Sequence, residues 1–193
     1  MSFVEHLYTS ECPKSQSAEY SSHGLKSLTP GDKLYILAKI QINRPIGNAI
    51  LEAKIQLNTT SRAYLVYSMQ EYLYINKAVD RELGALLADN AVREVCDTCI
   101  CPKCYGKGVV LYKKESRLIE CKKCSGVGRI VYKSKDLHKN INKQLSDKLT
   151  FEQFNSKYYD KYMDAVDQLH VAESAAKTFA HEVMNRLSGE LAA

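Results

Sequence analysis

The chain has no long apolar run and no recognisable enzyme motif. None of its 193 residues lie in a stretch close to the roughly 18 uncharged apolar residues that cross a membrane, so no membrane partner is expected. Met1 to Ser10 lacks the basic start and the apolar run of a signal peptide, which predicts an intracellular protein. The sequence also lacks a phosphate-binding glycine loop, a nucleophile elbow and a histidine–carboxylate cluster. We therefore do not expect an enzyme.

Composition and hydrophobic spacing divide the chain into four regions. With 45% hydrophobic and 25% charged residues, most of the chain should fold. Serine, scattered charge and the lack of an apolar period predict a flexible N-terminal tail over 1–27. Apolar residues at helical spacing predict a helical N-terminal part over 28–95 and a helical C-terminal part over 133–193. Cysteines concentrate in the region 96–132 between them.

Local signals mark the N-terminal helices. Thr29-Pro30 is typical of a helix start, and Arg44-Pro45 is typical of a break before a second, shorter helix. Tyr64–Ala78 is apolar on more than one side, which predicts a helix at the centre of the core. Its tyrosines could instead form a platform on which bases stack, but core packing with hydroxyls at the rim is the more common reason for such a pattern. Arg81–Val95 continues as a helix toward the cysteines.

The C-terminal part is predicted to hold three helices. A short basic helix is expected over Lys135–Lys143 and a turn over Ser146–Thr150. An amphipathic helix over Phe151–Leu169 and a last helix over Ala172–Leu187 follow. This order places a helix–turn–helix arrangement directly after the cysteines.

The motif CxxCxGxG occurs twice, as CPKCYGKG and CKKCSGVG. Two CxxC pairs are typical of a four-thiolate zinc site, because two intervening residues let both sulfurs of a turn reach one ion at about 2.3 Å. The glycines that follow allow positive φ angles and a close approach of the backbone to the sulfurs. We therefore expect one structural zinc ion with no open coordination position, bound by Cys101, Cys104, Cys121 and Cys124.

The 16 residues between the two pairs have the pattern of a hairpin. Val109–Tyr112 and Arg117–Ile119 read as two antiparallel strands joined by a turn at Lys113–Ser116. The predicted fold class is thus mainly α: a helical bundle with an inserted zinc-binding β-hairpin and a C-terminal helix-turn-helix.

Two alternatives concern the cysteines. Cys96 and Cys99 form a third CxxC pair, and either could replace Cys101 as a ligand, but only Cys104 is followed by the glycines. A CxxC pair can also be a redox switch. Duplicated, glycine-flanked pairs exceed what a redox site needs, so zinc binding is the preferred interpretation.

Positive charge gathers around the cysteines. Between Cys101 and Lys148 there are 13 Lys or Arg residues against four acidic ones, a surplus of nine, whereas the whole chain carries only +5. Clustered cations bind phosphate backbones and release their counterions. The surplus predicts a surface for a polyanion; a merely solvated basic face is the alternative.

The doubled motif resembles two known families. It is similar to the zinc region of DnaJ chaperones, which bind unfolded chains, but that family has four copies and a His-Pro-Asp motif that this chain lacks. CPKCYGKG and ECKKCSGVGR, together with Leu149–Leu169 and Glu173–Ala176, make the chain more similar to the Q antitermination proteins of lambdoid bacteriophages. That resemblance covers roughly Leu28 to Leu187.

The second resemblance implies a late-gene transcription antitermination factor in the cytoplasm of a bacterial host. Such a protein would bind double-stranded DNA at a late promoter, associate with paused bacterial RNA polymerase holoenzyme and suppress pausing and termination. An exit-channel role would also bring basic residues near nascent RNA. The alternative is a DnaJ-like zinc-containing chaperone or protein-binding adaptor. The residues expected to contact DNA are Arg129, Lys133, Lys135, Lys139, Asn140, Lys143, Lys148, Asn155 and Lys157.

Overall fold

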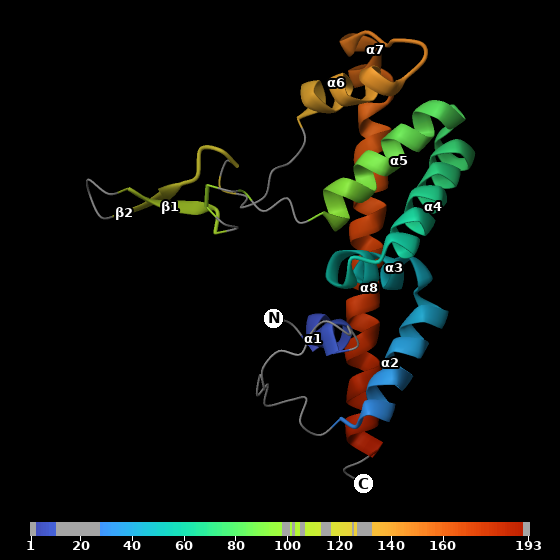
Figure 1. Cartoon of the computed structure of the whole chain (residues 1–193), viewed down its shortest axis with the longest axis vertical. Coiled ribbons are helices and arrows are strands. Elements are labelled where there is room, and N and C mark those ends of the chain that lie inside the picture. Colours follow the sequence, from blue (N-terminus) through green and yellow to red (C-terminus); the bar gives the residue numbers. More distant parts are fainter. Residues whose placement is uncertain are drawn as a thin grey trace.

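The computed structural model describes residues 3–10, 28–97, 101, 103–104, 107–112, 117–124, 126 and 133–190. This part of the chain is mostly helical with one two-stranded antiparallel sheet, which confirms the mainly α class and the hairpin. An elongated helical body runs along one long helix, α8 (Tyr159–Glu190), and the hairpin projects from its side (Figure 1). The other elements are α1 (Phe3–Ser10), α2 (Pro30–Asn43), α3 (Pro45–Leu51), the π-helical turn η1 (Glu52–Gln56), α4 (Thr59–Lys77), α5 (Arg81–Cys96), β1 (Val109–Tyr112), β2 (Arg117–Glu120), α6 (Ser134–Gln144) and α7 (Phe151–Lys157).

The predicted start of the first long helix is confirmed. The backbone N–H of Asp32 donates to Thr29 Oγ1 at 3.2 Å, and the backbone N–H of Thr29 donates to Asp32 Oδ2 at 2.8 Å. This capping box satisfies N–H groups that have no partner inside the helix. The predicted break is also present, because α2 ends at Asn43 and α3 begins at Pro45.

The N-terminus differs from the expected flexible tail. Phe3–Ser10 form helix α1, in which Val4, Leu7 and Tyr8 are buried. These side chains recur at spacings of three and four, which gives a short helix an apolar face. The Tyr8 hydroxyl donates to Asn48 Oδ1 at 2.6 Å and fixes α1 to α3. The rest of the expected tail, 11–27, lies outside the described residues.

Two hydrophobic clusters form the helical body, and α8 contributes to both. The first joins α3, α4, α5, α6 and α7 to the N-terminal half of α8, where Tyr162 and Leu169 are buried. The second joins α1 and α2 to the C-terminal half, through Ala176 and Ala180. In Figure 1 the α4–α5 pair therefore lies beside one end of α8 and α2 beside the other. None of the helices in the described ranges has the length and apolar character that a membrane crossing requires.

The C-terminal helices differ from the predicted boundaries. The expected helix over Phe151–Leu169 is broken at Tyr158, which separates α7 from α8. The expected break between Leu169 and Ala172 is absent, and α8 is continuous to Glu190. No glycine or proline lies between these two residues, so nothing in the local sequence ends the helix there.

Helix α4 is a core helix on one face only. Leu65, Met69 and Leu73 are buried, as the prediction of a central helix requires. Tyr64 and Tyr67, which were expected to pack in the core, are exposed on the opposite face. The apolar second side of this helix therefore faces outward in the described structure.

Helix α3 crosses α8 at a glycine. A Cβ atom on Gly47 would lie 2.4 Å from the carbonyl oxygen of Ala172 and 2.5 Å from Ala176 Cβ. Such distances leave no room for a side chain, so the two backbones can approach only because residue 47 is glycine.

A buried ion pair holds η1 against α8. Lys54 Nζ lies 2.9 Å from Glu173 Oε2, and Lys177 Nζ lies 2.8 Å from Glu173 Oε1. Burial raises the pKa of the Glu173 carboxyl, but hydrogen bonds from Lys177 and Lys54 outweigh it, so the pKa lies below its ordinary value. Glu173 is therefore ionised and paired at neutral pH.

Candidate metal centre

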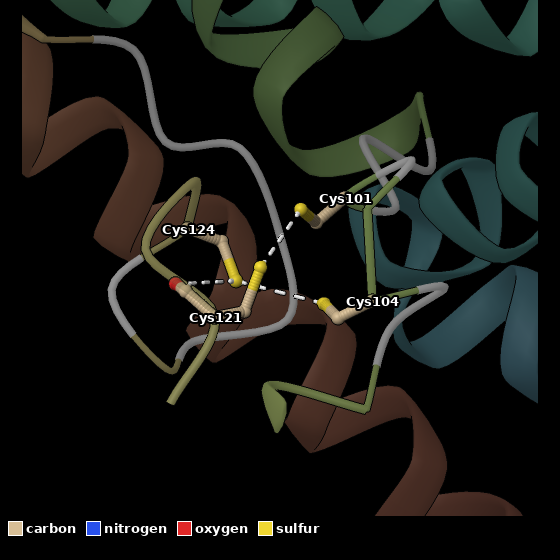
Figure 2. Close-up of side chains that lie close together, drawn as sticks. All are labelled: Cys101, Cys104, Cys121 and Cys124. Carbon is tan, nitrogen blue, oxygen red and sulfur yellow. Dashed lines mark hydrogen bonds between the residues drawn. The ribbon is translucent and has the colours of Figure 1, made fainter. Parts of the chain in front are cut away.

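The four predicted cysteines come together at the base of the hairpin. Their Sγ atoms all lie within 4.8 Å of one another. Cys101 Sγ is 3.7 Å from Cys121 Sγ, and Cys104 Sγ is 3.6 Å from Cys124 Sγ, so each short distance joins one CxxC turn to the other (Figure 2). These distances are far longer than the roughly 2.05 Å of a disulfide bond, and none of the four cysteines forms a disulfide.

The cluster fits a tetrahedral metal ion. Four zinc–sulfur bonds of about 2.3 Å place the sulfurs about 3.8 Å apart at the edges of a tetrahedron. The two short sulfur–sulfur distances, 3.7 Å and 3.6 Å, are close to this value. All four cysteines are buried, so the cluster could hold one structural ion away from solvent.

Two glycines with positive φ shape the turns around the sulfurs. Gly108 has φ +72° and Gly126 has φ +77°, a region that residues with a side chain seldom adopt. A Cβ atom on Gly108 would lie 2.1 Å from the carbonyl oxygen of Gly126, so the two turns also touch here. The predicted positive φ angles are thus confirmed at these two positions. Gly106 and Gly128 lie outside the described residues.

The hairpin connects the two cysteine pairs in register. Val110 pairs with Ile119 and Leu111 pairs with Leu118, which confirms the predicted strands, with β2 ending at Glu120. The backbone N–H of Cys121 donates to the carbonyl oxygen of Gly108 at 2.8 Å, which joins the end of β2 to the turn before β1. Only Val110 packs against the cysteine cluster among the described residues.

The environment of Cys101 favours a thiolate. Burial raises the pKa of this thiol, but the backbone N–H groups of Lys103 and Cys104 and hydrogen bonds with the Cys121 and Cys104 thiols outweigh that effect. The pKa falls from 9.0 to about 6. Because the thiolate is the metal-binding form of cysteine, this site is prepared for a cation at neutral pH.

Cys96 has a different environment. It is the last residue of α5 and lies in the first helical cluster, apart from the four sulfurs. Burial raises its pKa to about 11, so it stays a neutral thiol. The structure therefore brings Cys101 rather than Cys96 into the cluster; Cys99 lies outside the described residues.

The residues expected to contact DNA lie mostly on α6, on α7 and in the segment between them. Lys139, Asn140 and Lys143 line a shallow hollow on α6 with Asp136. Lys133 precedes α6 and Lys157 ends α7, and both are exposed, whereas Arg129 lies outside the described residues.

Other members of this set make contacts within the protein. The Lys135 ammonium lies over the Phe151 ring, 5.8 Å from its centroid. Lys148 Nζ donates to the carbonyl oxygen of Leu145 at 2.5 Å, and the Ser134 hydroxyl donates to Asn155 Oδ1 at 2.8 Å. These three side chains help to fix the segment between α6 and α7.

Two sets of exposed side chains were not predicted from the sequence. One is the outward face of the hairpin, which shows Val109, Leu111 and Leu118. Their alternation along the strands was the available signal. The other is the row of tyrosines on α4, which composition alone did not separate from core residues.

Fold and site together define a mainly helical protein with a four-cysteine hairpin that could hold a metal ion. Residues 68–189 match the model of the family described as conserved hypothetical protein CHP02642. The match covers more than half of the chain and includes all four cysteines, so the chain belongs to this family. No curated protein matches the sequence.

Proposed function

We propose that this protein is a transcription antitermination factor that binds DNA at a phage late promoter and associates with bacterial RNA polymerase. In this proposal a structural zinc ion holds the hairpin through Cys101, Cys104, Cys121 and Cys124. The observation that carries the proposal is the position of the four-cysteine hairpin, which is rich in basic residues and lies outside the helical body (Figure 1). The resemblance of its doubled CxxCxGxG motif to the Q antitermination proteins supplies the particular role.

The charges on the hairpin support a polyanionic or acidic partner. Its described cations are all exposed, and Glu120 is the acidic residue among the described positions there. Phosphate groups bind such clusters by displacing counterions. The exposed cations of the cysteine turns and strands are Lys103, Lys107, Arg117, Lys122 and Lys123.

The α6–α7 segment supports a DNA-binding role. Two helices joined by a short turn are the arrangement that a helix-turn-helix uses to enter the major groove. The Asn142 amide fixes that turn, because its Nδ2 donates to the carbonyl oxygen of Leu149 at 2.7 Å and its Oδ1 accepts from the Leu149 N–H at 3.2 Å. Lys139 and Lys143, one helical turn apart, remain on the open face of α6 for phosphate contacts.

Single-round transcription tests the role in termination. Bacterial RNA polymerase is started from a cognate late promoter and transcribes across a terminator with and without the protein. Readthrough is expected with the native chain and is expected to disappear when Cys104 and Cys124 are replaced by Ser. Unchanged termination on a verified cognate template rejects the antitermination role.

DNA affinity measured against salt concentration tests whether Lys139 and Lys143 on α6 contact DNA phosphates. Each phosphate contact contributes a slope of about 0.9 in log affinity against log salt, so Lys139→Gln with Lys143→Gln should lower the slope by about two. Lys33→Gln with Lys39→Gln removes the same charge from α2, at the other end of the body, and is expected to leave the slope unchanged. Equal effects of the two double variants would contradict a DNA surface on α6.

A protein-binding adaptor or chaperone is the second candidate, favoured by one observation. Leu111 and Leu118 are cross-strand partners and are 60% and 68% exposed, beside Val109. An apolar hairpin face of this kind can contact unfolded or partner chains. Suppression of the aggregation of an unfolding test protein, lost in Leu111→Ser with Leu118→Ser but kept in the α6 lysine variant, would support it.

A further inference from the structure

The outward face of α4 carries a row of aromatic side chains that the proposed function does not use. Tyr64, Tyr67 and Tyr74 are 44%, 63% and 45% exposed, and Ile75 beside them is 70% exposed. Single exposed apolar residues are ordinary, but a contiguous patch of this kind marks an interaction surface. Tyrosine is among the residues enriched at the centres of protein interfaces.

The spacing of this face is that of a helix-pairing seam. Tyr64, Tyr67, Glu71 and Tyr74 follow one another at intervals of three, four and three residues. Positions at such intervals form the contact line between two paired helices, and here three of the four are tyrosines. The intervals read the same in both directions, so the row can face a second, antiparallel copy of itself. Residue 64 then lies opposite residue 74, and residue 67 opposite residue 71.

Nearby charges argue against a nucleic acid as the occupant. Base-stacking surfaces combine aromatic rings with cations that follow the phosphate backbone. The cations of α4 and the first residue of α5 are already paired within the chain. Arg62 is bound to Asp97, Lys77 Nζ lies 3.0 Å from Asp164 Oδ2, and Arg81 Nη1 lies 2.7 Å from Glu71 Oε1.

We infer that this face binds a second copy of the chain, with the α4 helices of the two copies antiparallel about a two-fold axis near residue 69. In a two-fold interface each contact occurs twice, because residue i of one copy contacts residue j of the other and residue j contacts residue i. One row of side chains therefore supplies both sides of the interface. Tyr64 would pack on the partner's Tyr74, and the Tyr67 hydroxyl would donate to the partner's Glu71 carboxylate.

Charge determines the direction of the pairing. A parallel pair would place the two Glu71 carboxylates opposite each other, which is unfavourable, whereas the antiparallel pair opposes Glu71 to a hydroxyl donor. The Arg81 guanidinium stacks on the Tyr74 ring, 4.2 Å from its centroid, and also binds Glu71. Both side chains are thus held in position before a partner arrives, which reduces the entropy lost on association.

The extent of the face implies weak association. The row from Tyr64 to Tyr74 spans ten residue steps of α4, so the seam is about 15 Å long at about 1.5 Å per residue. A single helix pair of this length forms a smaller interface than the roughly 1,200–2,000 Å² of stable complexes. Self-association is therefore expected to depend on concentration in the micromolar range.

Sedimentation velocity of the zinc-loaded full chain over about 1–200 μM tests the inference without DNA or polymerase, so its outcome is independent of the proposed function. The native chain should shift from monomer to dimer. Tyr67→Glu should weaken association at least tenfold, because it faces the partner's Glu71. Tyr67→Lys, an equally polar change at the same exposed position, should keep or strengthen association because it places an ammonium opposite that carboxylate.

Tyr35→Glu is the matched control, since Tyr35 is similarly exposed but lies on α2. It should leave association unchanged. A chain that stays monomeric at every concentration overturns the inference. Equal loss of association in Tyr67→Glu and Tyr67→Lys overturns the antiparallel register. Loss of association in Tyr35→Glu would show that the interface lies on α2 and not on α4. Circular dichroism checks that each variant folds. Tyr64→Ser, which removes the aromatic ring at one end of the seam, repeats the test should Tyr67→Glu not fold.

Discussion

The sulfur atoms of four cysteines are the groups on which the candidate site depends most directly. They all lie within 4.8 Å of one another, are buried, and come from two turns that the backbone of Gly108 and Gly126 brings into contact. A closed set of four thiolates leaves no coordination position for substrate, which is typical of structural zinc rather than catalytic zinc.

Zinc stoichiometry distinguishes the ligands from the other described cysteine. Cys104→Ser removes one of four thiolates and is expected to lower the bound zinc well below one equivalent per chain. Cys96→Ser changes a neutral thiol in the helical core and is expected to keep one equivalent. Metal analysis after gel filtration measures both. Loss of zinc from Cys96→Ser would place that residue among the ligands.

Acid is expected to release the metal over a defined range. The folded-state pKa of Cys101 is about 6, lowered from 9.0, so its thiolate persists as pH falls from 9 to about 6 and is lost below that value. Stabilisation that depends on the lowered pKa is therefore full above pH 9, declines progressively as pH falls to about 6 and is absent below it. A colorimetric zinc indicator should report no release between pH 9 and 7 and release only below about pH 6. Release that begins near pH 8 would contradict the lowered pKa.

At the scale of elements, the crossing of α3 and α8 determines how closely these two helices of the body pack. Gly47 lets the backbone of α3 lie directly on Ala172 and Ala176, and the Lys54–Glu173 pair holds the next turn on the same side. Ion pairs of this burial contribute little net stability, but removing one partner leaves a buried charge.

Gly47→Ala is expected to lower the free energy of unfolding by about 1–3 kcal/mol, because the added methyl group meets backbone that cannot move without separating the helices. Gly31→Ala is the control: its Cβ would lie 3.6 Å from Thr29 Oγ1, an ordinary contact, and stability should stay the same or rise slightly. Urea unfolding followed by circular dichroism measures both. Equal stability of the two variants would contradict the close crossing.

The sequence predicted where helices begin and break better than it predicted which side of a helix is buried. Capping at Thr29 and the break at Pro45 could be read directly, since each depends on residues adjacent in the chain. The outward side of α4 could not be distinguished from its core side, because which side is covered depends on where α5 and α8 pack. For the same reason the length of α8 was missed, since its continuity through Leu169–Ala172 is stabilised by both clusters.

The candidate site was predictable because it is local. Two CxxC turns and a hairpin of 16 residues bring four ligands together with no help from the distant chain. The contacts of Lys135, Lys148 and Asn155 were not predictable, because each depends on the packing of α6, α7 and the turn between them. Spacing therefore identified the four cysteines that come together, but it did not show which basic side chains are bound within the protein.

At the scale of the whole molecule, hairpin and helical body have separate cores. Val110 is the described hydrophobic residue that packs against the cysteine cluster, and neither helical cluster includes a described hairpin residue. Each part should therefore lose its structure independently of the other.

Removal of zinc by a strong chelator is expected to unfold the hairpin and leave the body intact. The helical signal in circular dichroism should fall little, while amide hydrogen exchange should accelerate in 107–124 and stay slow in α5 and α8. Restoring zinc should reverse the change. A cooperative loss of the whole helical signal would show that the two parts fold as one unit.

The position of α8 has a consequence for how the chain folds during synthesis. Both helical clusters include residues of α8, although many of their other members come from α1 to α5, which are made much earlier. On the ribosome, α1 to α5 therefore expose apolar faces until α8 emerges, and the contacts that cover them span most of the chain. A nascent chain of this kind would stay accessible to chaperones at the ribosome throughout translation, and its folding rate would be limited by the late docking of one helix.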